Sequence, residues 1–128
     1  MKPSRIEIDG LGELSIPENA LYGINTARAL INFPINGRKL GDEVTLVRSF
    51  GYLKKAAALA NRDLGVLTTQ TADAIAGACD ELINGRLNQY LVVPLLEGSG
   101  GTSTNMNINE VLANQAQHYL GHPVGSYQ

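Results

Sequence analysis

The fold is decided by one stretch of the sequence, Glu97-Gly98-Ser99-Gly100-Gly101-Thr102-Ser103-Thr104-Asn105-Met106-Asn107-Ile108-Asn109-Glu110-Val111, in which three glycines precede hydroxyl and amide side chains and then an apolar pattern. Glycine adopts positive φ and has no Cβ, so such a loop can turn tightly and bring its N–H groups close to a ligand. A helix that begins after these glycines leaves its first N–H groups without intrahelical partners and carries partial positive charge there. The stretch therefore predicts a cradle for a small anion.

The same residues also fit a simpler interpretation, in which Thr102 or Ser103 caps the helix and the glycines only form its entry turn. The residues alone leave both interpretations open. Two nucleotide-binding motifs fit less well: a Walker A loop requires Lys after its last Gly, but no Lys follows Lys55, and Ser103 stands where a dinucleotide fingerprint requires its third Gly. Nucleotide binding is therefore disfavoured, and a small carboxylate remains the expected ligand.

Downstream of the glycines, residues 102–120 predict a long helix that Gly121 ends. Its apolar side chains recur at helical spacing, at Ile108, Val111, Leu112, Ala116 and Tyr119. Asparagine is a mediocre helix former, yet this helix contains Asn105, Asn107, Asn109 and Asn114. Some of these amides are therefore expected to be buried and hydrogen-bonded.

The rest of the chain predicts a mainly helical fold with a small N-terminal hairpin packed on the helices. Residues 5–17 alternate around an Asp-Gly turn, which favours two antiparallel strands. Helices are expected over 27–32 with Thr26 as cap, from about 46 to 64, and from 69 or 71 to 84. In the second of these, a seam facing other helices is predicted at Leu46, Phe50, Leu53, Ala57, Ala60 and Leu64. Residues 89–96 suggest a strand, with Pro94 limiting it to an edge or an extended segment.

The composition of the chain limits the classes of function that can be expected. The chain has 128 residues, 44% hydrophobic content and a formal net charge of -2, which indicate one domain and give no reason to expect nucleic acid or an anionic membrane as partner. The single cysteine, Cys79, is expected to be a small buried residue in a reducing, cytoplasmic setting, and no secretory signal or membrane span is expected. His118 and His122 lack a third ligand nearby, so zinc is not expected.

Three basic residues are candidates for a functional site. Lys54 and Lys55 are expected on or near the solvated edge of their helix, without a catalytic role. Arg28 fits a solvated helix arginine, and it also fits a carboxylate clamp or a subunit contact.

Several blocks of the sequence resemble the aspartase/fumarase superfamily. Residues 101–107, Gly-Thr-Ser-Thr-Asn-Met-Asn, together with Asn-Glu-Val at 109–111 and Ala-Asn at 113–114, are similar to the first signature region of that superfamily. The pair Ser103-Thr104 resembles aspartate ammonia-lyases more than class II fumarases. Similar blocks occur in the family's order at residues 22–33, 54–61 and 78–81. Glu97, Ser99 and Gly100 depart from the Gln, Gly and Ala that are typical of close aspartases.

This resemblance implies that residues 1–128 are an N-terminal domain of the L-aspartase-like fold, truncated before the central helical bundle of a much longer chain. It implies a homotetrameric enzyme that reversibly and without a cofactor eliminates ammonia from L-aspartate to give fumarate. The general-base serine would lie outside these residues, so that the 128 residues alone would be inactive.

Within this chain, the resemblance implies substrate binding by Thr102, with Gly100 and Gly101 shaping the backbone around the substrate. Ser103, Thr104 and Asn105 are implied in supporting or helix-capping roles. Two alternatives stay open: a class II fumarase or another lyase of the superfamily, and a helical anion-binding or interaction module without catalysis. The substrate assay and the length of the open reading frame separate these alternatives.

Overall fold

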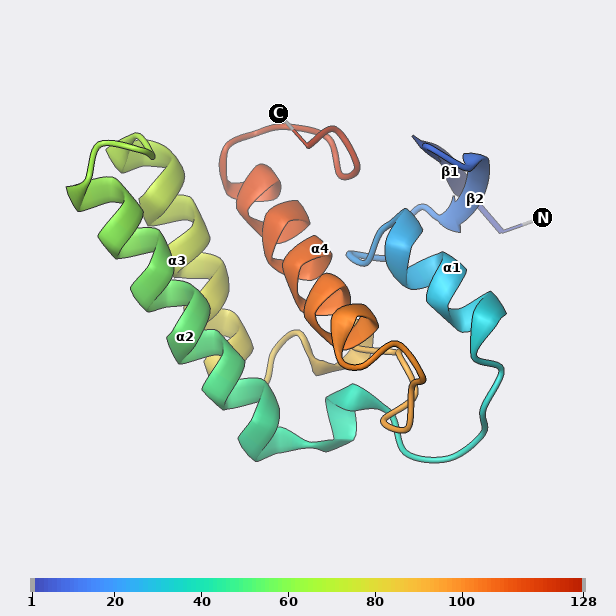
Figure 1. Ribbon diagram of the computed structural model, residues 1–128. Coiled ribbons are helices and arrows are strands. Elements are labelled where there is room, and N and C mark those ends of the chain that lie inside the picture. The colour runs from blue at the N-terminus through green and yellow to red at the C-terminus, as the bar shows by residue number, and fades with distance from the viewer. Residues whose placement is uncertain (1, 128) are drawn as a thin grey trace.

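A computed structural model describes residues 2–127, and α4 stands at the centre of them (Figure 1). The pair α2 and α3 lies on one side of α4, and α1 with the hairpin lies on the other. The elements in chain order are β1 (Ser4–Asp9), β2 (Gly12–Pro17), α1 (Ile24–Asn32), the 3-10 turn η1 (Leu40–Asp42), α2 (Val44–Asp63), α3 (Thr69–Ile83), the 3-10 turn η2 (Asn88–Tyr90) and α4 (Thr102–Tyr119). The predicted helical class with an N-terminal hairpin is confirmed.

The hairpin is antiparallel and pairs Asp9 with Gly12 across a two-residue turn, as its Asp-Gly sequence predicts. Gly12 has φ +108°, a conformation that favours glycine. The inner face of the hairpin carries Glu7 and Ile16, which are both buried, whereas Ile6 and Ile8 are 58% and 69% exposed. A charged side chain thus occupies the protected face of β1, where it serves the hydrogen-bond network described below.

The main core lies where α2, α3 and α4 meet. Its buried members are Leu40, Val47, Ala74, Ala78, Cys79, Leu82, Leu87, Leu91, Ile108, Val111, Leu112 and Ala116. The Thr68 hydroxyl caps α3 by accepting from the Thr71 N–H at 3.1 Å, and Gly85 and Gly121 take positive φ just beyond α3 and α4. The predicted ends of both helices are therefore confirmed to within a residue or two.

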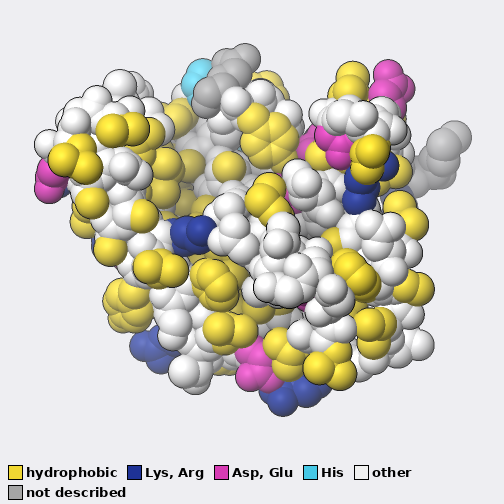
Figure 2. Space-filling model, viewed as in Figure 1, with side chains coloured by type: hydrophobic (Ala, Val, Ile, Leu, Met, Phe, Trp, Pro, Cys, Tyr) yellow, Lys and Arg dark blue, Asp and Glu magenta, His cyan; other side chains and the backbone are white. Residues whose placement is uncertain are grey.

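The predicted seam of α2 is wrong for the described residues. Most of its side chains face outward, with Leu53 61% and Leu64 78% exposed, and Figure 2 shows hydrophobic side chains exposed over α2. The buried side of α2 instead carries Val47, Gly51 and Ala58. A Cβ at Gly51 would lie 2.6 Å from Ile83 Cγ1, so the missing side chain lets α3 approach closely there.

The strand suggested for residues 89–96 does not form. The segment begins with η2 and continues as a connection with one isolated bridge between Pro94 and Lys39. Its carbonyls accept from the backbone of η1, with Leu40 N to Val93 O and Gly41 N to Leu91 O both 2.9 Å. The segment reaches the glycine loop as an irregular connection with a bend at Val93 and a turn at Leu95-Leu96, so it is extended only in part.

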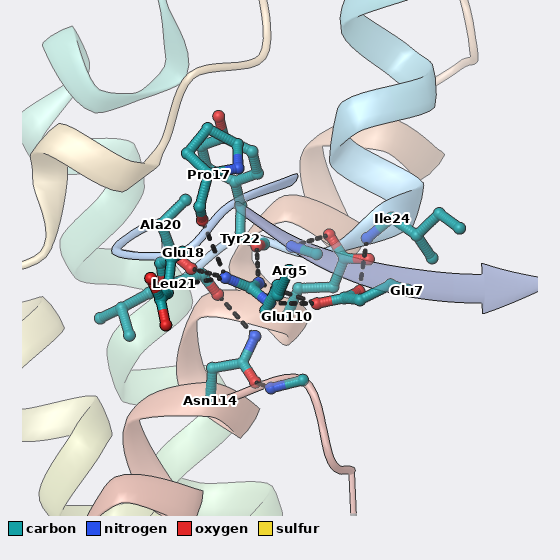
Figure 3. A network of polar contacts seen from close by, with 12 residues as sticks. Arg5, Glu7, Pro17, Glu18, Ala20, Leu21, Tyr22, Ile24, Glu110 and Asn114 are labelled. Atoms are coloured by element: carbon teal, nitrogen blue, oxygen red, sulfur yellow. Dashed lines mark hydrogen bonds and ion pairs between the residues drawn. The ribbon is translucent and has the colours of Figure 1, made fainter. Parts of the chain in front are cut away.

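The start of α1 is set by a carboxylate from α4 (Figure 3). Glu110, which is buried, accepts from the N–H groups of Gly23, Asn25 and Thr26 at 2.8–3.0 Å and from the Thr26 hydroxyl at 2.6 Å. The helix therefore begins at Ile24, three residues before the predicted start, and Thr26 lies inside it instead of capping it. An anion at a helix N-terminus satisfies its free N–H groups and its dipole.

The same network fixes the hairpin and the chain that follows it. Glu7 accepts from the Ile24 N–H at 2.9 Å and from the Arg5 guanidinium. Arg5 also donates to the carbonyl oxygens of Pro17, Ala20 and Tyr22 at 2.8–3.0 Å, as Figure 3 shows. The hairpin is thus held to α1 and to the connecting segment by charged hydrogen bonds, which are stronger than neutral ones, while Glu110 holds α1 to α4.

Buried asparagines of α4 extend this polar framework. Asn107 accepts from the N–H groups of Val92 and Val93, and its Nδ2 donates to Tyr90 O at 3.0 Å. Asn114 Nδ2 donates to Leu21 O at 2.8 Å. The expectation that some of these amides are buried and satisfied is confirmed, since both side chains have 0% exposure. None of the helices within residues 2–127 combines the length and apolar character needed to cross a bilayer.

Candidate functional site

The candidate site is the glycine loop with the first turn of α4. Gly100 and Gly101 have φ +72° and +100°, values that L side chains rarely adopt, and Gly101 immediately precedes the helix. Gly98 serves a different purpose, because a Cβ there would lie 2.9 Å from Phe33 Cε1. The loop sequence thus reflects two needs, a left-handed turn into α4 and close packing against the end of α1.

A carboxylate already lies in this loop, and it belongs to Glu97. Its oxygens accept from the N–H groups of Ser99 and Gly101, the latter at 2.9 Å, and from the Thr104 hydroxyl at 3.4 Å. The Ser99 hydroxyl in turn accepts from the Ser103 N–H at 2.8 Å. The backbone at the start of α4 is therefore arranged to hold a carboxylate.

The hydrogen bonds also change the acidity of Glu97. Burial acts to raise the pKa of its carboxyl group, but hydrogen bonds from the side chain and N–H of Ser99 and from the Gly101 N–H outweigh burial, so the pKa lies below its usual value. Glu97 is therefore ionised at neutral pH and remains an acceptor. The sequence signalled this residue only as a departure from the glutamine of close aspartases.

The loop brings the six predicted substrate-binding residues to one end of α4. Gly100, Gly101 and Thr102 are exposed, and the Thr102 hydroxyl makes no hydrogen bond within residues 2–127. Ser103, Thr104 and Asn105 are half-buried beneath the loop. Hydroxyl and amide groups of this kind can donate to an anion. Their role in substrate binding stays a prediction.

Sequence reasoning missed Lys54, which reaches this site from α2. Its Nζ donates to Asn105 Oδ1 at 2.7 Å, and the residue is half-buried, as Lys55 is. The next residue, Lys55, pairs instead with Asp80 of α3 at 2.7 Å. Spacing on α2 could not separate the two lysines; only the position of α4 does.

The remaining candidates have structural roles. Arg28 of α1 donates two hydrogen bonds of 2.7 Å to Asp9 and one of 2.9 Å to Gly12 O. The carboxylate that it binds therefore belongs to the N-terminal hairpin of the same chain. The hydrogen bond from Arg28 holds the pKa of Asp9 below its usual value. Cys79 is buried as expected, and burial raises the pKa of its thiol to about 11.

The histidines lie apart from the loop. His118 is exposed in the last turn of α4, and His122 is exposed beyond it. Within residues 2–127, no three His, Cys, Asp or Glu side chains lie close enough together to hold a metal ion.

Comparison with known proteins shows what the chain resembles. A family model described as "Lyase" matches residues 12–125. An aspartate ammonia-lyase of Helicobacter pylori is 46% identical over 124 residues, covering 97% of this chain and 26% of the relative. A class II fumarate hydratase of Halobacterium salinarum is 47% identical over 121 residues, covering 94% of this chain and 25% of the relative.

A solved structure agrees with these matches. The fumarate lyase:delta crystallin of Brucella melitensis, crystallised with cobalt, superimposes with a TM-score of 0.95 at 46% identity, covering 98% of this chain and 27% of that one. The chain spans about a quarter of the length of the curated relatives that it matches.

Proposed function

This chain belongs to the fumarate lyase family, the aspartase/fumarase superfamily, and from that membership we propose that residues 1–128 form the N-terminal domain of an aspartate ammonia-lyase. The reaction of the whole enzyme is the reversible elimination of ammonia from L-aspartate to give fumarate, without a cofactor. Support comes from the relative of H. pylori named aspartate ammonia-lyase and from the Ser103-Thr104 pair in the first turn of α4. In this proposal the enzyme acts in the cytoplasm.

The observation that carries the proposal is the exposed Thr102 in the first turn of α4, whose hydroxyl makes no hydrogen bond within residues 2–127, whereas the loop N–H groups of Ser99 and Gly101 already hold Glu97. Elimination removes a proton from the carbon beside a substrate carboxylate, and that carboxylate becomes more negative as the proton leaves. Fixed donors aimed at it stabilise the transition state more than the ground state. Thr102 binds this carboxylate in our proposal, while Gly100 and Gly101 shape the backbone around it.

The neighbouring side chains support the binding residue. Ser103, Thr104 and Asn105 keep the first turn of α4 in place and add donors to it, which fits their half-buried positions. The general base is a serine outside these 128 residues. Sites of this kind are completed by other subunits of a homotetramer, so the 128 residues alone are expected to be inactive.

The experiment uses the protein encoded by the complete gene. Ammonia release from L-aspartate is measured with fumarate absorbance followed in parallel, and Thr102→Ala is compared with the unaltered enzyme. We expect ammonia and fumarate to appear in equal amounts, and Thr102→Ala to lower kcat/KM by roughly 10- to 100-fold, as the loss of one charge-assisted hydrogen bond implies. Turnover by the purified 128-residue chain would contradict the expectation that it is inactive.

Class II fumarase is the second candidate function. The relative of Halobacterium salinarum named fumarate hydratase is 47% identical, so identity does not favour either substrate. The same full-length protein is therefore also assayed with malate. Turnover of malate without turnover of aspartate would move the assignment to fumarase.

A further inference from the structure

Two adjacent lysines of α2 have different surroundings. Lys55 forms an ion pair with Asp80. Lys54, in contrast, forms no ion pair within residues 2–127, and its one hydrogen bond is to the amide oxygen of Asn105. An ammonium group that is partly removed from water without a counter-ion costs free energy. The contact with Asn105 is therefore the feature that distinguishes Lys54 from Lys55.

The contact between Lys54 and Asn105 fixes which way the asparagine amide faces. A carboxamide can present either its oxygen or its nitrogen to a neighbour, but a lysine ammonium only donates. Lys54 therefore takes Oδ1 and leaves Nδ2 of Asn105 with both of its N–H donors available. Nδ2 makes no hydrogen bond within residues 2–127, and it is not enclosed among the buried unpaired atoms.

Asn105 lies three residues after Thr102, so the two side chains emerge on the same side of α4. They are in its first turn, where the helix dipole favours an anion. The charge of Lys54 has the same sign as this end of the helix, so both attract an anion there. The ionised Glu97 carboxylate in the adjacent loop opposes that attraction, which makes the added charge of Lys54 the more useful.

On the basis of the function proposed above, we propose that Lys54 is a positioning residue that orients the Asn105 amide so that its donors face the substrate carboxylate. Lys54 acts through Asn105 and does not take part in proton transfer. Its charge also stabilises the bound dicarboxylate. Thr102 binds the carboxylate beside the carbon that loses its proton, so the proposal assigns Asn105 to the other carboxylate, whose charge is the same in the ground state and the transition state. The contact therefore affects binding more than turnover.

The test uses the full-length protein of the complete gene with Lys54→Met, Lys54→Arg and the matched control Lys55→Met. KM and kcat are measured with L-aspartate, and the dissociation constant of succinate, a dicarboxylate that cannot eliminate ammonia, is measured by calorimetry. We expect Lys54→Met to raise KM and the succinate dissociation constant about tenfold, as for one charge-assisted hydrogen bond, with kcat changed by no more than about twofold.

The other variants separate orientation from folding. Lys54→Arg should restore most of the affinity, and Lys55→Met should leave both constants unchanged. In an Asn105→Ala background, Lys54→Met should raise the succinate dissociation constant less than it does in the unaltered protein, because only the attraction of its charge remains to be lost. If Lys54→Met does not fold, Lys54→Gln, which keeps a donor without the charge, takes its place and should show a smaller rise.

Succinate affinity unchanged by Lys54→Met, a loss of kcat alone, or an equal effect of Lys55→Met would overturn the proposal. An unaltered protein that binds succinate through Lys54 but turns over neither aspartate nor malate would instead refute the proposed function and leave this inference standing. A protein that does not bind succinate would refute the role of Lys54 as well.

Discussion

Removal of the Glu110 carboxylate should loosen α1 more than any other single change among the acidic residues of α4 and the hairpin. The side chain is 4% exposed and accepts four hydrogen bonds, three of them from backbone N–H groups of the first turn of α1. In Glu110→Ala these donors lose their acceptor in a place that water reaches poorly. A buried donor left unpaired costs about 1–3 kcal/mol.

With four donors affected, the low end of that range predicts a loss of roughly 4 kcal/mol in the free energy of unfolding for Glu110→Ala. Glu110→Gln keeps one oxygen acceptor but turns an NH₂ group towards N–H donors, and we expect a loss of about 2 kcal/mol. These are large fractions of the 5–15 kcal/mol that domains usually have. The control is Glu13→Gln, because Glu13 is exposed on the hairpin; it should change the free energy of unfolding by less than about 0.5 kcal/mol.

The assay is urea unfolding at neutral pH, followed by the circular dichroism of the helices and analysed by linear extrapolation. We expect Glu13→Gln to unfold at the same urea concentration as the unaltered chain, Glu110→Gln at a lower concentration, and Glu110→Ala at the lowest. If both Glu110 variants unfold at the same urea concentration as the control, the carboxylate does not hold α1, and this account of the network is wrong.

Three further predictions follow from the described contacts. Arg28→Ala should lower the free energy of unfolding at neutral pH, because it removes the ion pair with Asp9. The pKa of Asp9 is depressed in the folded chain, so the contribution of this pair is complete above about pH 4 and is lost as the pH falls through the lowered pKa. The urea midpoints of the variant and of the unaltered chain should therefore converge in acid. Gly101→Ala should cost about 1–2 kcal/mol because of its positive φ, against almost nothing for Gly10→Ala, as thermal unfolding would show. Cys79, with a pKa of about 11, should react with a disulfide reagent at pH 8 only as fast as the protein opens, and rapidly in guanidinium; immediate reaction of the folded chain would contradict its burial.

The elements that sequence predicted well are those whose signals are local. The ends of α3 and α4 follow from a threonine cap at Thr68 and from glycines at 85 and 121, each within a few residues of the helix that it bounds. The glycine loop could also be predicted from sequence, since positive φ at Gly101 requires no partner elsewhere in the chain. Such features depend on neighbouring residues and not on the tertiary arrangement.

The elements that sequence missed depend on residues far along the chain. The start of α1 is set by Glu110, which is 84 to 87 residues away from the groups that it caps. The apolar stripe of α2 pointed to one face, whereas Gly51 made the other face the closer fit to α3. Lys54 and Lys55 looked alike, and only the distant Asn105 distinguishes them. Periodicity shows that a face is apolar but does not show which neighbour covers it.

Because Glu110 caps a helix that lies far away in the sequence, the start of α1 can become ordered only when α4 is in place. Amides in the first turn of a helix usually exchange their hydrogens early, because helix ends fray. Here the N–H groups of Gly23, Asn25 and Thr26 gain their acceptor only after α4 has docked across most of the chain. Closing so long a loop is slow compared with forming a local turn. We therefore expect the N-terminal turn of α1 to be one of the last parts of the domain to become ordered, so that protection of its amides from exchange would report the docking of α4.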